Sequence, residues 1–291
     1  MSTEPIWDEH PELRRPVLVA GFKGWNDAAD SASDAVEWLA TNLDGRPFAR
    51  IDPECFYDFQ TTRPHVSVRD GVTEHITWPR NQFSAATGTT SPHDVIILRG
   101  VEPNFAWKSF CDAVVRVAHE MRCELVVTLG ALLADVPHTR PPTITGTATD
   151  PDLIARLGLD RSRYEGPTGI VGVLHDACRS AGLVSASLWA PVPHYVAAAP
   201  DPMASRELVF RFAQLTGLHL DLTELDLAAE GWRNRVSAAV VGDSDTSAYV
   251  AELESRFDAE IADPGRADLP SGVELAEELE RYLREQRGEQ S

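Results

Sequence analysis

The sequence lacks the long apolar runs and the basic stretches that would direct a protein to membranes or nucleic acids. None of its apolar runs approaches the roughly 20 residues needed to cross a bilayer, and residues 1–12 are acidic, unlike a signal peptide. Lysine and arginine together number 26 against 45 aspartates and glutamates, and the formal charge of −19 repels phosphate backbones. We therefore expect a soluble, cytoplasmic protein that binds neither membranes nor nucleic acid.

Cysteine is also scarce. The chain has 4 cysteines, and neighbouring ones are 12 or more positions apart. This spacing is typical of neither a zinc clamp nor a redox dithiol. We expect reduced thiols, with no metal and no cofactor.

Apolar residues make up 43% of the 291 residues and charged residues 24%, which is typical of a globular protein. This length suits one large core with an appendage. We expect a core domain over residues 1–200, a helical appendage over 201–260, and an acidic helical tail over 261–291.

Short apolar runs alternate with segments of helical periodicity along the first 200 residues. The expected strands are Arg15–Phe22, Asp94–Arg99, Glu124–Leu129, residues 143–149 and Ser185–Ala190, and the expected helices are Asn26–Leu43, Asn104–Met121, Pro151–Leu157 and Thr168–Ala181. Asp70-Gly71 predicts a β-hairpin turn, since glycine tolerates positive φ. Strands that alternate with helices predict a mainly parallel sheet with both faces covered, which is a three-layer α/β/α sandwich. Further on we expect helices at Glu207–Leu215, Leu222–Val241 and Gly272–Glu285.

Five segments carry side chains suited to binding or proton transfer, and four of them directly follow expected strands. In open α/β sheets, ligands bind outside the carboxyl ends of the strands, so these segments predict a shared crevice. The candidate rim consists of Gly24, Asn26, Asp27, Arg99, Glu102, His138, Arg140, Glu165, Gly166, Thr168 and His194. Backbone amides near Gly24 and Gly166 suit an anion, and Thr168 is a candidate N-cap. His138 suits proton transfer near neutral pH, and Arg140 suits a carboxylate or phosphate.

Each segment also has a purely structural interpretation. The turn at Gly24 can simply cap a helix, and Arg99 can pair with Glu102. His138 and Arg140 can hold their loop by bonding to backbone carbonyls, and glycine near Gly166 can let a helix pack close to the sheet. No nucleophile elbow and no His-x-x-x-His spacing is present in the sequence.

Taken in order, five motifs resemble those of the proteasome assembly chaperone 2 family, in its actinobacterial branch. They are GFKGWNDAAD, LRGVEPNFAW, LGALLADVPHTRP, YEGPTGIVGVLHDAC and SLWAPVPHYVAAAPDP, within residues 17–217. The resemblance implies a phosphorylase or peptidyl-hydrolase-like α/β/α fold and homo-oligomers, with a trimer favoured. Eukaryotic members help assemble proteasome α-rings, and archaeal relatives bind the proteasome through a C-terminal hydrophobic-Tyr-x tail. Arg287–Ser291 lacks that tyrosine, so the resemblance does not predict docking by this route.

Two functions from different classes follow. The first is a non-enzymatic, oligomeric assembly factor or chaperone, whose partners are other copies of itself and a protein client. The alternative is a small-molecule binding protein or hydrolase-like enzyme that uses Asp27, Arg99, His138, Arg140 and His194 at the rim. The absence of a recognisable catalytic set favours the first.

Overall fold

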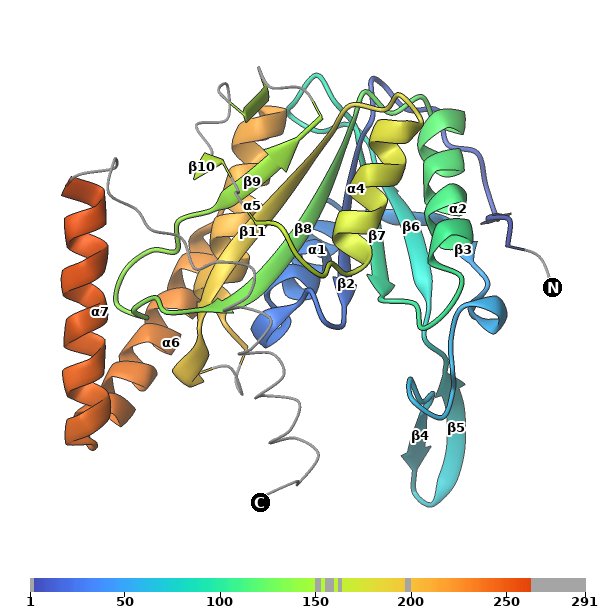
Figure 1. Cartoon of the computed structure of the whole chain (residues 1–291). Helices are drawn as coiled ribbons and strands as arrows, with labels where there is room; N and C mark the ends of the chain where they lie inside the picture. Colours follow the sequence, from blue (N-terminus) through green and yellow to red (C-terminus); the bar gives the residue numbers. More distant parts are fainter. Residues whose placement is uncertain (1–2, 150–152, 155–159, 162–163, 197–199, 263–291) are drawn as a thin grey trace.

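The computed structural model describes residues 3–149, 153–154, 160–161, 164–196 and 200–262. Its centre is a nine-stranded sheet with helices on both faces (Figure 1). In sheet order the strands are β1 (Ile6–Trp7), β3 (Arg46–Ile51), β6 (Asn81–Ala86), β7 (Val95–Val101), β2 (Val17–Lys23), β8 (Leu125–Ala134), β11 (Ser185–Pro193), β9 (Thr145–Ala148) and β10 (Asp160–Arg161). This architecture confirms the expected α/β/α sandwich.

Only the middle of the sheet is uniformly parallel. Strands β7, β2, β8 and β11 run in one direction, and Val17 of β2 lies between Val95 and Leu125. The pairs β1–β3, β3–β6, β6–β7 and β9–β11 are antiparallel. The expectation of a mainly parallel sheet is therefore wrong at its flanks, because β3 and β6 were not among the expected strands and β9, which was, runs antiparallel to β11. The carboxyl ends of the four central strands nevertheless share one edge, as the rim hypothesis requires.

Among the described helices, two pack on each face of the sheet. Helices α1 (Ser31–Asn42) and α5 (Pro202–Thr216) pack together on one face, and α2 (Trp107–Glu120) and α4 (Ile170–Ser180) pack on the other. Each pair closes its own apolar cluster, because the central strands bury side chains on both faces. Three short 3₁₀ turns complete this part of the chain: η1 (Ala28–Asp30), η2 (Pro53–Cys55) and η3 (His194–Val196).

The expected hairpin is confirmed. Strands β4 (His65–Arg69) and β5 (Val72–Thr77) pair as a separate antiparallel sheet. Asp70 and Gly71 between them have φ values of 52° and 77°, as a tight hairpin turn requires. In Figure 1 the hairpin projects beyond the main sheet, at the end where β7 finishes and α2 begins.

Helices α6 (Thr223–Val241) and α7 (Ser244–Ala262) form the appendage beyond the sandwich. Helix α5 lies within the stretch assigned to that appendage, but its buried side chains Ala204, Leu208, Val209 and Phe212 belong to the core cluster over α1. We therefore propose that the core extends to Gly217, which ends α5 with a left-handed φ of 66°. The expected helix at Gly272–Glu285 and most of the one at Pro151–Leu157 lie outside the described residues. No helix in the described part of the chain is both long and apolar enough to span a membrane.

Candidate functional site

Glu102 joins three elements at the carboxyl edge of the sheet. Its Oε2 accepts a hydrogen bond of 3.0 Å from the backbone N–H of Trp25, which follows β2. Its Oε1 accepts from Asn26 Nδ2 at 3.0 Å and from the backbone N–H of Ile170, the first residue of α4, at 2.8 Å. The carboxylate therefore fixes the β2 loop and the start of α4 to the end of β7.

Glycines in this region permit the close approach of these groups. A Cβ atom on Gly24, whose φ is 143°, would lie 2.7 Å from the Cβ of Glu102. On Gly169 it would lie 1.9 Å from Asn26 Nδ2 and 2.6 Å from Glu102 Oε1. The space that the sequence offered to an anion at the start of α4 is filled by the Glu102 carboxylate, which satisfies the helix dipole from within the chain.

The predicted rim residues before α4 are exposed to solvent. Glu165, Gly166 and Thr168 are exposed, and Gly169 rather than Thr168 is the N-cap of α4. The predicted Thr168 cap is therefore wrong, because the carboxylate of Glu102 takes the first helical amide instead. The Thr168 hydroxyl lies over Gly172, where an added Cβ would meet it at 2.0 Å.

Asn26 and Asp27 are buried at the start of the first helical segment. Asp27 Oδ1 accepts hydrogen bonds from the backbone N–H groups of Ala32 at 2.7 Å and Ser33 at 3.0 Å, so it caps α1. The pKa of Asp27 is raised to about 6, because burial raises it by more than these hydrogen bonds lower it. Within the described residues, Asn26 Oδ1 and Asp27 Oδ2 have no hydrogen-bond partner.

The raised pKa of Asp27 predicts a pH-dependent effect of the substitution Asp27→Asn. Above pH 6 the folded parent carries an ionised, buried carboxylate at a cost, whereas asparagine cannot ionise. As pH falls from 6 to 4, the folded parent takes up its proton before the unfolded chain does and thereby gains stability. The stability of the variant relative to the parent should thus be about 2 kcal/mol more favourable at pH 8 than at pH 4, by denaturant unfolding. If the difference in stability between variant and parent were the same at pH 8 and pH 4, the raised pKa of Asp27 would be contradicted.

Arg99 does not reach the rim. Its guanidinium donates to Glu37 of α1 at 2.8 Å and to Gln82 of β6 at 3.2 Å. The predicted pairing of Arg99 with Glu102 is therefore wrong, since both residues have other partners. Arg99 instead attaches α1 to the sheet.

His138 lies in the interface between the core and the appendage. It is buried, with Nδ1 2.8 Å from the Tyr195 hydroxyl and Nε2 3.0 Å from Ser237 Oγ of α6. Its ring meets that of Trp232 edge to face, with centroids 6.4 Å apart. Burial lowers the pKa of His138, which favours the neutral ring. The imidazole thus links the loop after β8 to α6.

Arg140 and His194 extend the same interface. The Arg140 guanidinium donates to both carboxylate oxygens of Asp258 in α7 at 2.9 Å and to Glu254 at 3.3 Å. His194 Nδ1 lies 3.2 Å from Asp135 Oδ1, which also accepts from the Tyr249 hydroxyl of α7 at 3.2 Å. His138 and Arg140 therefore hold the loop after β8 in place, as the structural interpretation proposed. Their partners, however, are side chains of α6 and α7 and not backbone carbonyls.

The rim is therefore divided into two internal joints. Glu102, Asn26 and the glycines form one, and His138, Arg140 and His194 form the other. A cavity of about 10 Å³ beside His138 has room for about one water molecule. No three His, Cys, Asp or Glu side chains are grouped to hold a metal ion in the part of the chain that the structure describes.

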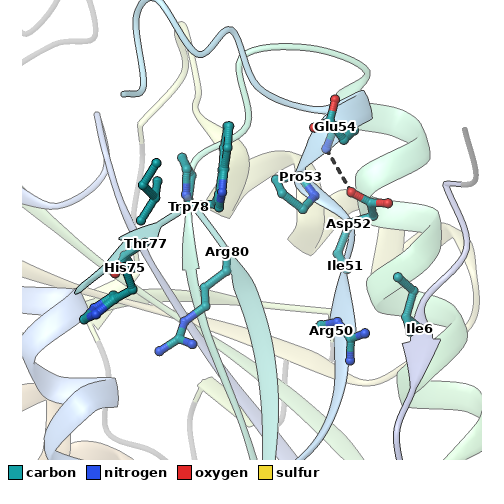
Figure 2. A pocket seen from close by; sticks show the side chains of 12 residues that line it. Ile6, Arg50, Ile51, Asp52, Pro53, Glu54, His75, Thr77, Trp78 and Arg80 are labelled. Atoms are coloured by element: carbon teal, nitrogen blue, oxygen red, sulfur yellow. Dashed lines mark hydrogen bonds between the residues drawn. The ribbon is translucent and has the colours of Figure 1, made fainter. Parts of the chain in front are cut away.

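A larger cavity lies elsewhere, at the base of the hairpin. Its volume is about 680 Å³, and Figure 2 shows its two walls. One wall comes from β5 and the residues after it, including Ile76 and Trp78, and the other from β3 and η2, including Arg50 and Ile51. The sequence predicted the hairpin but not this cavity, whose walls are about 25 residues apart in the chain.

The hairpin also exposes apolar residues that the rim hypothesis did not include. Val66, Val68, Val72 and Ile76 are each more than half exposed. A signal for this was present, since Val66 and Val68 at alternate positions before a tight turn, with Ile76 after it, predict an apolar face. The sequence did not show that this face stays uncovered by the described part of the chain.

Comparisons with known proteins agree with the motifs quoted above. The profile of the PAC2 family matches residues 21–240. A PAC2 family protein from Streptomyces avermitilis is 46% identical, over 81% of this chain and 99% of that one, with a TM-score of 0.75. A proteasome-assembly chaperone homologue from Mycobacterium tuberculosis is 41% identical, over 80% and 99% of the two chains, also with a TM-score of 0.75.

A more distant structure shares the fold. The archaeal proteasome activator PbaB of Pyrococcus furiosus is 18% identical, over 82% of this chain and 99% of that one, with a TM-score of 0.65. No curated protein matches the chain by sequence.

Proposed function

Because this chain belongs to the PAC2 family, we propose that it is a self-associating, non-enzymatic assembly factor whose ligands are proteins. The names of its relatives support a chaperone-like role, since the Mycobacterium tuberculosis protein is a proteasome-assembly chaperone homologue. We further propose that it works in the cytoplasm, where its cysteines stay reduced.

One observation carries this proposal: three polar side chains of the predicted ligand rim, Glu102, His138 and Arg140, already have partners within the chain. Each of the three makes two or more hydrogen bonds to residues far away in the sequence. Ligand binding or hydrolysis at the rim would require them to give up these contacts. The cavity of about 10 Å³ beside His138 would also have to open.

Proteasome subunits are the protein client that the relatives suggest, and mixing experiments test this. Sedimentation velocity of the purified full-length chain, alone and with unassembled actinobacterial proteasome α-subunits, should show a self-associated species and a heavier mixed complex. Serum albumin in place of the α-subunits is the control. A particle of 31.9 kDa at every concentration, with no change on mixing, would contradict the proposal.

A further inference from the structure

The apolar side chains that the fold leaves exposed are concentrated at one end of the molecule. Of the twelve large hydrophobic residues exposed in the described chain, six lie on the hairpin or on the loops joined at its base. We call the surface formed by residues 58–80 and 103–108 the hairpin end; its exposed apolar side chains are Val66, Val68, Val72, Ile76, Trp78 and Phe105. Figure 1 shows the hairpin projecting at the end of the sheet where β7 finishes.

The loops of the hairpin end are joined to one another. Trp78 meets Phe59 edge to face, with centroids 4.8 Å apart. The backbone N–H of Asp58 donates to Asn104 Oδ1 at 2.9 Å, and the N–H of Phe105 donates to the Phe56 carbonyl at 3.0 Å. The aromatic loops therefore form a fixed base from which the hairpin extends.

The hairpin has an apolar face without a partner in the described part of its own chain. Val66 lies directly opposite Ile76, and Val68 lies on the same face, two residues along β4. Ser67 on the other face bonds to His75 Nδ1 at 2.9 Å. Every residue of the two strands except Ser67 is exposed. An isolated two-stranded sheet is marginally stable in water, so this face needs a cover.

The charge of the hairpin end indicates which partner binds to its apolar face. The hairpin end carries four basic and three acidic side chains, whereas the whole chain carries a net −19. Two copies repel each other through most of their surfaces but not through this one. A strongly basic partner would be attracted to the acidic remainder of the molecule instead.

We infer that a second copy of the chain covers the hairpin end, so that the hairpins of neighbouring copies pack apolar face to apolar face. The cavity of about 680 Å³ at the hairpin base, with Ile76 and Trp78 in its wall, gives the neighbour a concave surface to enter. This inference rests on the proposed function, because it assigns the surface used for self-association.

Paired substitutions of valine by threonine test the inference, because threonine keeps the shape and the β-branching but adds a hydroxyl. The variant Val66→Thr/Val68→Thr alters the apolar face. The matched control, Val184→Thr/Val241→Thr, alters exposed valines elsewhere in the chain. Sedimentation equilibrium gives the mass, and far-ultraviolet circular dichroism checks the fold. We expect a parent mass that is a multiple of 31.9 kDa, at least tenfold weaker association for the hairpin variant, and no change for the control.

The experiment distinguishes a failure of the inferred surface from a failure of the proposed function. A parent that self-associates as strongly as its hairpin variant would overturn the assigned surface and leave the proposed function standing. A parent that remains at 31.9 kDa at all concentrations would overturn self-association and the inference together. Capture of a different protein by the hairpin of a monomeric parent would also overturn the inference.

Discussion

Replacing Glu102 with alanine should lower the free energy of unfolding by about 3 kcal/mol. The half-buried carboxylate accepts hydrogen bonds from Trp25, Asn26 and Ile170, at 2.8 to 3.0 Å. Its loss leaves the amide of buried Asn26 and the first N–H of α4 without their acceptor. Hydrogen bonds to a charged group contribute more than neutral ones, and unsatisfied buried donors are costly. Urea unfolding followed by circular dichroism measures the effect.

Glu165→Ala is the matched control for this prediction. Glu165 is also a glutamate near the start of α4, but its side chain is exposed. Its replacement should change stability by less than about 0.5 kcal/mol, as surface substitutions usually do. If the two variants were equally stable, Glu102 would not be the joint between β2, β7 and α4 that its geometry indicates.

Replacing Trp232 with alanine should destabilise the chain by about 3 to 5 kcal/mol, because a large buried aromatic leaves a cavity. Trp232 is 3% exposed and, with Val236 of the same helix α6, packs in one apolar cluster with Met203 of α5. The effect should be concentrated in the appendage, since elements with few buried contacts open locally. Amide hydrogen exchange should therefore accelerate in α6 and α7 more than in the central strands.

Leu227→Ala is the control within the same helix, because Leu227 is 65% exposed. It should alter exchange in α6 only slightly. Uniform acceleration across the sheet in Trp232→Ala would mean that the appendage is not a separate unit docked on the β8 loop. That outcome would contradict the role of His138 and Arg140 as links between the core and the appendage.

The sequence predicted those features whose causes are local. Asp70-Gly71 specifies its own turn, and the apolar runs around Val17 and Val95 mark buried strands wherever they pair. Strands β3 and β6 escaped prediction because RPFARI and NQFSAA are short and contain proline or polar residues. Their strand identity depends on pairing with each other and with β7.

The candidate rim shows what sequence cannot provide. The partners of these side chains are distant in the chain: Glu102 and Ile170 are 68 residues apart, His138 and Ser237 are 99 apart, and Arg140 and Asp258 are 118 apart. The Glu102 carboxylate, which suggests a ligand site in the sequence, accepts a hydrogen bond from the first N–H of α4 in the structure. A histidine or arginine on a loop is therefore ambiguous until its neighbours across the fold are known.

We propose that this protein acts through its hairpin end, by contact with other protein chains, while the rim holds the fold together. Hydrogen exchange of the full-length chain across a wide range of protein concentration tests this division of roles in a single experiment. Amides of residues 65–77 should become protected as concentration rises, while those of residues 23–27 and 134–140 should exchange at a constant rate. Exchange of the hairpin amides that is fast and independent of concentration would contradict the proposal.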